Sequence, residues 1–331
     1  ALKAIRLPLS GCSTAVKKLG PHLLNRRDIK RVVQDPTNPD VRLVLLSEEA
    51  SAAPELPDSV RAFIEEMGGG GGGGTGGDAG AGNGDLAGGA GVWQIVPYVL
   101  HLDWNDVTAS EVLQELLPPG VDVPSAFESV GHVAHVNLRK EHEPYKRLIG
   151  QVLLEKNAPR IRTVVNKCAD IGASKFRTFA MELLAGEPDL EVTVMESDVE
   201  LRFNYGQVYW NSRLQAEHAR VLAQVQPGEV VVDMFAGAGP FAVPAARHRK
   251  AVVHANDLNP HAPIFLAANA ARNKIDRGVF KVYNLDGREL VTKLVEDGLE
   301  RPQHVIMNLP AIATEFLGSL KPWLGGQSEA T

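Results

Sequence analysis

Cysteine is scarce in this chain of 331 residues: only Cys12 and Cys168 occur, far apart and with no Cys-x-x-Cys pair or Cys/His cluster around either. Disulfide frameworks and cysteine zinc sites need such clusters, so the sequence excludes both and favours a reducing compartment.

The seven acids between 182 and 200 lack the ligand spacing of a metal loop. We therefore expect no metal, and we interpret that stretch as the solvent-facing edge of a hairpin.

Long apolar runs are also missing. None approaches the roughly 20 residues that a membrane helix needs. The runs that are present, such as residues 230–232, have the length of a strand. The sequence therefore excludes a transmembrane role.

Acidic residues are absent from the first 27 positions, which hold six basic residues, Lys3, Arg6, Lys17, Lys18, Arg26 and Arg27. This bias is typical of mitochondrial presequences. However, residues 5–9 alternate like a short strand and residues 14–24 have the periodicity of an amphipathic helix. We favour the second interpretation, in which this segment opens a folded domain.

The remaining composition is that of a soluble globular protein, with 44% hydrophobic residues and a net charge of −6 from 34 basic and 40 acidic residues. Its length suffices for two or three domains. Glycine is concentrated, since 15 of the 32 glycines lie in residues 68–91. Such a segment has almost no side chains to bury, so we expect a disordered insertion that carries no chemistry.

The glycine-rich insertion interrupts a small α+β domain. Residues 42–46 and 93–102 have the pattern of strands, and residues 59–67 and 109–117 that of helices. The Leu117-Pro-Pro-Gly120 break places the end of this domain near residue 118.

Residues 119–205 are expected to form a middle α+β domain, with a strand over residues 131–138 and a helix entered at 144–149. Between 139 and 177, ten basic residues face four acids, a charge of 10 − 4 = +6. This excess favours an anionic partner, because phosphate neutralisation dominates nucleic-acid affinity. A solvated face of mixed charge explains the composition equally well.

The last third, residues 206–331, alternates strands with helices. Strands are expected at 229–234, 251–255, 282–285 and 304–307, and helices at 240–248, 262–273 and 290–296. This rhythm predicts an α/β domain with a parallel, doubly wound, Rossmann-like sheet that binds ligands at the carboxyl ends of its strands.

Each of these strands ends in a polar or glycine-rich element: Asp233-Met-Phe-Ala-Gly-Ala-Gly239, Asn256-Asp-Leu-Asn-Pro260, Asp286-Gly287 and Asn308-Leu-Pro310. A glycine turn admits a ligand close to the backbone, and an acid after the next strand can accept the hydroxyls of a ribose. Gly237-x-Gly239 alone would equally suit a nicotinamide enzyme. Asp233 argues against pyrophosphate at the turn and favours a cationic ligand such as the sulfonium S-adenosylmethionine.

On these residues the sequence resembles the class I S-adenosylmethionine-dependent methyltransferases. More narrowly, it resembles the eukaryotic and archaeal tRNA (guanine-N1)-methyltransferases, which modify guanosine 37, on the 3′ side of the anticodon. The resemblance spans nearly the whole chain outside the glycine-rich insertion. It is most specific in Gly131-His-Val-Ala-His-Val-Asn-Leu-Arg139, Leu148-Ile-Gly-Gln-Val152, Met181-Glu-Leu-Leu-Ala-Gly-Glu187, Val208-Tyr-Trp-Asn-Ser-Arg-Leu-Gln-Ala-Glu-His218 and the strand-end motifs.

The resemblance implies S-adenosylmethionine as cofactor, tRNA as partner and methyl transfer to guanine N1, which in tRNA-Phe is also the first step toward wybutosine. It implies that the two α+β domains contact RNA and that residues 206–331 form the methyltransferase domain. It leads us to expect a monomer in the cytoplasm, the nucleus or both, with the mitochondrial matrix as an alternative.

The resemblance also assigns catalytic roles. N1 of guanine carries a proton at neutral pH, so methylation needs a base. Glu217 matches the family's base; without the surrounding motif it would read as a solvent-facing glutamate. Arg177 matches the arginine that stabilises charge on O6, with a phosphate contact as its alternative role. Arg213 positions the base or the RNA, or forms an ordinary i,i+4 ion pair with Glu217, and Tyr209 contacts RNA.

The cofactor positions implied by the resemblance are Gly237, His218, Asp257, Leu258, Asp286, Gly287 and Asn308. Asp257 would hold the ribose hydroxyls and Asp286 the adenine amino group, although Asp286-Gly287 alone is more often a turn. The Asn308 amide would lie at the reacting centre. A buried amide without partners is costly, which favours a functional role for it.

Members of the family continue past the asparagine-proline motif with further strands. Only residues 311–331 follow here, room for one helix and a tail, so we expect a domain that is short at its C-terminus. Two alternatives to the methyltransferase stay open: the related aminocarboxypropyltransferase of wybutosine synthesis, and a tRNA-binding protein with an inactive domain.

Overall fold

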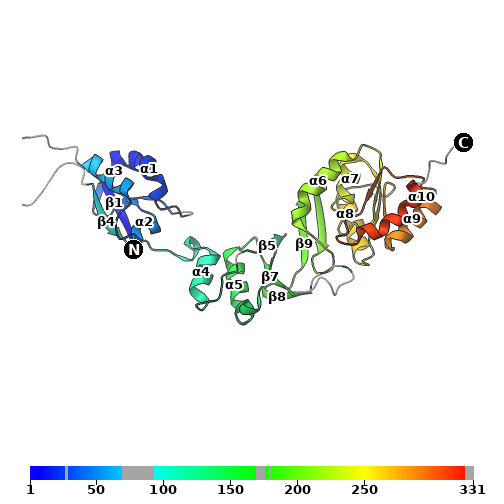
Figure 1. The fold of residues 1–331 in the computed structure, drawn as a ribbon, viewed down its shortest axis with the longest axis horizontal. Helices are drawn as coiled ribbons and strands as arrows, with labels where there is room; N and C mark the ends of the chain where they lie inside the picture. Colours follow the sequence, from blue (N-terminus) through cyan, green and yellow to red (C-terminus); the bar gives the residue numbers. More distant parts are fainter. Residues whose placement is uncertain are drawn as a thin grey trace, which may run out of the picture. The chain divides into compact units, whose positions relative to one another are not determined.

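The computed structural model describes residues 1–26, 29–68, 93–124, 126–168, 176, 178 and 180–324. The chain divides into two compact units, Ala1–Thr108 and Ala109–Thr331 (Figure 1). Apart from Gly68, the glycine-rich insertion lies outside the described residues.

The first unit is an antiparallel sheet of order β2-β3-β1-β4 with helices on it. Its strands are β1 (Leu2–Pro8), β2 (Val32–Asp35), β3 (Asn38–Leu45) and β4 (Gln94–Tyr98). Its helices are α1 (Cys12–Leu19), α2 (Glu48–Ala52) and α3 (Asp58–Gly68), with 3-10 turns η1 (Leu9–Gly11), η2 (Gly20–His22) and η3 (Trp104–Asp106).

Strand β1 shows why the N-terminal segment folds. Its side chains alternate between the two faces of the sheet, so Ile5 and Leu7 pack in one buried cluster with α1 and α3. Leu2 and Ala4 pack in a second cluster. The prediction that this segment opens a folded domain is confirmed: β1 lies inside the sheet, and α1 follows it after the 3-10 turn η1.

The second unit begins with helix α4 (Ala109–Leu116) and a sheet of order β5-β6-β7-β8. The strands are β5 (Glu128–Val130), β6 (Val133–Val136), β7 (Thr163–Cys168) and β8 (Ala180–Gly186), and β6 and β7 are parallel. The 3-10 helix η4 (Lys140–Tyr145) and helix α5 (Lys146–Lys156) connect β6 to β7.

Helix α5 lies very close to β8. A Cβ at Gly150 would meet the Cβ of Leu184 at 2.6 Å, which explains a glycine in the middle of a helix. Leu113 of α4 packs in the same cluster as Ile149 and Val152 of α5. The sequence analysis assigned the helix at 109–117 to the first domain; its packing places it in the second unit.

A hairpin follows, formed by β9 (Glu191–Glu196) and β10 (Val199–Asn204). Ser197 and Asp198 make its two-residue turn with φ of 48° and 55°, the backbone that tight hairpin turns require. Leu201 and Phe203 of β10 pack in one buried cluster with helices of the last third. The 3-10 turn η6 (Ser212–Leu214) and helix α6 (Gln215–Gln224) come next.

The last third forms a parallel sheet of order β13-β12-β11-β14, as predicted. Its strands are β11 (Val230–Asp233), β12 (Val252–Asn256), β13 (Phe280–Tyr283) and β14 (His304–Ile306). The helices between them are α7 (Ala242–Arg249), α8 (Ala262–Arg272) and α9 (Gly287–Glu296), and η7 (Ala313–Leu320) and α10 (Lys321–Leu324) follow β14.

Both faces of this parallel sheet are covered. Val231 packs with α7 and α8, whereas its neighbour Val232 packs with α9, η7 and α10. Adjacent strand residues point to opposite faces, so one continuous apolar run can serve both layers. No helix in the described ranges is long and apolar enough to cross a membrane.

Candidate functional site

The carboxyl ends of the parallel strands are tied together by Asn256, the last residue of β12. Its buried side-chain amide donates to the carbonyls of Met234, at 3.1 Å, and Leu285, at 3.0 Å. Its Oδ1 accepts from the amide of Leu285 at 2.9 Å. Asn256 therefore fixes the chain segments after β11, β12 and β13 at one edge, where the sequence predicted a ligand site.

Asp233 ends β11 and is fully buried. Its Oδ1 accepts a hydrogen bond from the amide of Phe235 at 3.3 Å, and its Oδ2 has no hydrogen-bond partner. Burial raises the pKa of this carboxyl from 3.8 to about 8, and the nearby Asp257 charge adds to the shift. An unpaired buried acceptor of this kind fits a ligand that carries positive charge or hydrogen-bond donors.

The glycine turn after Asp233 needs its two glycines for different reasons. Gly237 has φ +56°, and a Cβ there would have no neighbour closer than 3.7 Å. Gly239 has φ +97°, and a Cβ there would meet Val243 Cγ2 at 2.7 Å. Gly239 thus permits close packing of α7, whereas Gly237 supplies a positive φ in the turn, with Tyr209 and Val208 at van der Waals distance from a Cβ there.

Asp257 follows β12 and holds the glycine turn. Its Oδ2 accepts from the amide of Gly237 at 2.8 Å, and its Oδ1 accepts from the amide of Asn259 at 2.9 Å. Burial raises the pKa of this carboxyl, and the two amides oppose that shift. Leu258, next in the chain, is half-buried. Each oxygen of Asp257 keeps acceptor capacity, as a ribose partner would need.

Asp286 caps helix α9, with its Oδ1 accepting from the amide of Arg288 at 2.9 Å. This is the turn-type role that the sequence left open, and Oδ2 keeps its capacity for a ligand. Gly287 is required by packing, since a Cβ there would lie 3.0 Å from Met234 Cε and 3.2 Å from Phe316 Cδ1. The guanidinium of Arg288 lies 4.0 Å from the centroid of the Phe316 ring.

Asn308 follows β14, and its side chain is half-buried with no hydrogen bond to any described residue. Its amide is therefore available to a ligand at the same edge of the sheet as Asp233 and Asp257. The sequence argument assumed a buried amide, whereas Asn308 is half-buried, so its role at the reacting centre stays a prediction.

His218 lies on α6 and is buried. Its Nδ1 pairs with the carboxylate of Glu196, the last residue of β9, while its Nε2 is buried without a partner. Its ring meets that of Phe241 edge-on, with centroids 4.5 Å apart. Because Phe241 follows the glycine turn by two residues, His218 adjoins the strand-end site.

Glu217, the expected base, forms a two-pronged ion pair with Arg220, at 2.6 and 2.7 Å. The Arg220 guanidinium holds the pKa of this carboxyl below its ordinary value. The ligand-free arrangement is thus the solvent-facing one that the sequence left open. The i,i+4 pair suggested between Arg213 and Glu217 is not formed; the partner of Arg213 is Glu128 of β5.

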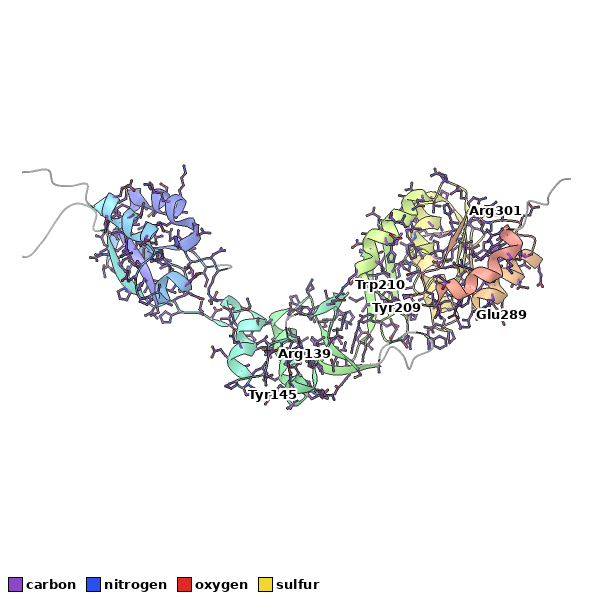
Figure 2. All side chains as sticks on the ribbon, viewed as in Figure 1. Arg139, Tyr145, Tyr209, Trp210, Glu289 and Arg301 are labelled. Carbon is purple, nitrogen blue, oxygen red and sulfur yellow. The ribbon has the colours of Figure 1, made fainter. Side chains whose placement is uncertain are left out.

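Arg213 and Tyr209 line a cavity of about 210 Å³ together with His135 of β6, and a neighbouring cavity of about 480 Å³ shares Arg213 and His135. Tyr209 and Trp210 lie just before α6 (Figure 2). Burial lowers the pKa of His135 to about 4, so its ring is neutral. Both its ring nitrogens lack hydrogen bonds, although Nε2 lies 3.5 Å from Glu128.

Arg177, the residue expected to stabilise charge on O6, lies outside the described residues.

The basic excess of residues 139–177 is offset by acids that surround it. Arg139 lies 3.4 Å from Asp122, Lys146 lies 2.9 Å from Glu182, and Arg162 lies 3.5 Å from Glu187. Asp122, Glu182 and Glu187 lie outside residues 139–177, so the net charge of +6 counted over that range does not include them. For these residues the mixed-charge interpretation holds.

Sequence reasoning missed the roles of Asn256, Arg220 and Glu196. The i,i+3 spacing of Glu217 and Arg220 was a visible signal for an ion pair. Glu196 gave none, because its partner lies 22 positions further along the chain. Within the described ranges, no group of three or more His, Cys, Asp or Glu side chains could hold a metal ion.

The fold and the site define an α/β protein with a ligand site at the carboxyl edge of a parallel sheet. Residues 193–324 match the TRM5/TYW2 methyltransferase domain, and residues 109–189 match the TYW2 N-terminal domain. Two curated relatives bear the name tRNA (guanine(37)-N(1))-methyltransferase. The one from Phytophthora infestans is 44% identical over 97% of this chain and 74% of its own length.

The relative from Dictyostelium discoideum is 38% identical over 85% of this chain and 55% of its own length. Among solved structures, the complex of aTrm5 and tRNALeu superposes with a TM-score of 0.65 at 21% identity, covering 98% of this chain and 84% of that one. At 21% identity, the superposition on that complex shows a shared fold and nothing further. The chain belongs to the tRNA (guanine(37)-N(1))-methyltransferase family.

The family uses S-adenosylmethionine as its methyl donor, and the residues at the strand ends fit this molecule. Asp257 and Asp286 offer acceptors for hydroxyl and amino groups, and Gly237 and Gly239 put no side chain on the turn that follows β11. The unpaired atoms of Asp233 and His218 suit its cationic and donor groups.

Proposed function

We propose that this protein transfers a methyl group from S-adenosylmethionine to N1 of guanosine 37 in tRNA. The observation that carries the proposal is the strand-end site, where Asp257 braces the glycine turn and Asp233, at the end of β11, keeps a buried Oδ2 without a hydrogen-bond partner. The two helix-covered faces and the strand order β13-β12-β11-β14 support a class I methyltransferase domain.

When bound, S-adenosylmethionine supplies an electrophilic methyl group. Asp257 accepts hydrogen bonds from the ribose hydroxyls, and Asp286 accepts one from the adenine amino group through Oδ2. Gly237 and Gly239 put no side chain on the turn that the cofactor approaches. The Asn308 amide binds at the reacting centre, where it orients the target base against the methyl group.

Glu217 removes the N1 proton as the methyl group arrives. Its carboxylate is paired with Arg220, and base catalysis requires this ion pair to open. Arg177 stabilises the negative charge that develops on O6. This division gives proton removal and charge stabilisation to separate side chains.

The RNA is contacted by Arg213 and Tyr209 at the mouth of the cavities that His135 lines. Residues 1–118 and 119–205 form the tRNA-binding part of the protein, and residues 206–331 the catalytic part. Arg213 is exposed and paired with Glu128, so we propose that a phosphate of the RNA competes with this carboxylate for the guanidinium.

A second candidate, aminocarboxypropyl transfer from the same cofactor, is favoured by one observation, the match of residues 109–189 to the TYW2 N-terminal domain.

Methyl transfer to guanosine 37 is tested by incubating the protein with methyl-labelled S-adenosylmethionine and unmodified tRNA that carries guanosine or adenosine at position 37. We expect label in the guanosine tRNA alone. No label in either tRNA would contradict methyl transfer. Aminocarboxypropyl transfer would then leave the label in methylthioadenosine, whereas an inactive tRNA-binding protein would leave it in unreacted S-adenosylmethionine.

A further inference from the structure

Glu196 and His218 form a buried pair between two separate elements. Glu196 ends β9 and His218 lies on α6, and their side chains are 6% and 3% exposed. The Nδ1 of His218 contacts Glu196 Oε1, and the opposite ring nitrogen, Nε2, is buried and has no partner. His218 is one of the expected cofactor positions and adjoins the glycine turn through Phe241. Glu196 has no role in the reaction described above.

The chemistry of the pair determines where the ring proton sits. A carboxylate only accepts hydrogen bonds, so the ring nitrogen that faces Glu196 carries the proton. In a neutral imidazole the other nitrogen is then an acceptor. A buried acceptor without a partner is costly, which makes the unpaired Nε2 a position where a ligand donor would be stabilised.

S-adenosylmethionine offers three kinds of donor: ribose hydroxyls, the adenine amino group and the α-ammonium group. The first two have acceptors in Asp257 and Asp286 under the proposed function. The ammonium group has only donors and needs an acceptor of its own.

We propose that Glu196 is a positioning residue that holds His218 as the Nδ1–H tautomer, so that Nε2 accepts a hydrogen bond from the α-ammonium group of the cofactor. The proposal rests on the proposed function for the identity of the ligand. The tautomer itself is a property of the ligand-free protein. The acidic end of β9 thereby acquires a role that the sequence analysis did not give it.

The ring nitrogens of His218 test the first half directly. Long-range ¹H–¹⁵N spectra of the ligand-free protein, with the resonance assigned by loss in His218→Asn, should show a protonated Nδ1 and an unprotonated Nε2. Glu196→Leu should move the proton to Nε2 or mix the two forms. A wild-type ring that carries its proton on Nε2, or on both nitrogens, would overturn the proposal.

Binding of two cofactor relatives tests the second half. S-adenosylhomocysteine carries the ammonium group, whereas its deaminated analogue keeps the carboxylate and lacks only the amino group. Calorimetry should show that Glu196→Leu weakens S-adenosylhomocysteine about tenfold or more, the scale of a hydrogen bond to a charged group. The deaminated analogue should bind Glu196→Leu as it binds the wild type.

Glu196→Gln keeps an acceptor of the same reach and should restore most of the affinity for S-adenosylhomocysteine. The matched control is Glu191→Gln on the same strand, whose carboxylate pairs with Arg202 at the surface, and it should bind like wild type. Equal losses in the Gln and Leu variants, or equal losses for both ligands, would contradict the tautomer role. If wild-type protein binds neither ligand, the proposed function and the ammonium contact both fail, and the spectra alone decide the tautomer.

Discussion

The Oδ2 of Asp257 accepts a hydrogen bond from the amide of Gly237 at 2.8 Å, which joins the end of β12 to the turn after β11. Gly237 has φ +56° and carries no side chain in this turn. Under the proposed function one carboxylate both shapes the turn and accepts from the cofactor, so its loss should affect binding more than the loss of an isolated contact would.

Asp257→Ala should weaken S-adenosylmethionine binding by about 1–3 kcal/mol, the range for charge-assisted hydrogen bonds. The matched control is Asp276→Ala, because Asp276 also accepts a backbone amide, that of Gly278 at 2.5 Å, in an exposed turn away from the strand ends. Calorimetry on both variants checks the prediction. Unchanged affinity in Asp257→Ala would remove this residue from the site.

Asp233 should make the ligand-free protein less stable as pH rises. Its pKa is raised from 3.8 to about 8 in the folded state, so between these values the folded protein binds more protons than the unfolded chain. The free energy of unfolding then falls with increasing pH across this window. Urea unfolding at pH 5 and pH 8 should show a smaller fall for Asp233→Asn than for the wild type. Equal falls would mean that Asp233 is not buried as the structure has it.

Glu217→Gln keeps the shape of the side chain but cannot take a proton, so single-turnover methylation should drop by roughly 10²–10⁴-fold while both ligands still bind. Higher pH should partly rescue this variant, because guanine N1 then loses its proton to hydroxide. A wild-type rate at neutral pH would exclude Glu217 as the base.

Arg220→Gln tests the ion pair that holds Glu217. Arg220 lowers the pKa of Glu217, so its removal should raise that pKa and move the acid limb of the pH–rate profile to higher pH. The pH profile of kcat/KM from acid to neutral pH is the measurement, because it reports the free enzyme, in which the pair is formed. A shift to lower pH would contradict the assignment of this limb to Glu217.

Glu128→Gln and Arg213→Ala should change tRNA affinity in opposite directions. Arg213 is 78% exposed and paired with Glu128, so neutralising Glu128 frees the cation for phosphate. The Kd for tRNA should fall by up to about fivefold in Glu128→Gln and rise by up to about fivefold in Arg213→Ala, the scale of one exposed charge contact. Filter binding at two salt concentrations checks this, with S-adenosylmethionine affinity as the internal control. Equal losses in both variants would mean that the pair acts as a structural unit.

The parallel sheet was predictable because its strands are short apolar runs with helices between them, and Val231 and Val232 each serve one face. The strand-end residues were predictable for the same reason, since topology alone brings Asp233, Asp257 and Asn308 to one edge. Asn256 was visible in the motif, but its task of bridging two neighbouring segments depends on the strand order.

Contacts between distant segments could not be predicted from the sequence. The partner of Arg213 lies 85 positions away in β5, and the Glu196–His218 pair joins a hairpin to a helix. Local periodicity contains no information about such pairs, because they depend on how β5 and the β9–β10 hairpin pack in the second unit. The helix at 109–117 was placed in the wrong unit for the same reason: its apolar face gave no sign of which neighbour it covers.

The most direct test of the account is mass spectrometry of one undermodified tRNA with guanosine 37, incubated with the protein and S-adenosylmethionine and digested to nucleosides. The account predicts a gain of one methyl group, located on N1 of that guanosine and absent when Glu217 is replaced by Gln. A gain of the larger aminocarboxypropyl group, or an unchanged guanosine in a tRNA that the protein still binds, would contradict it.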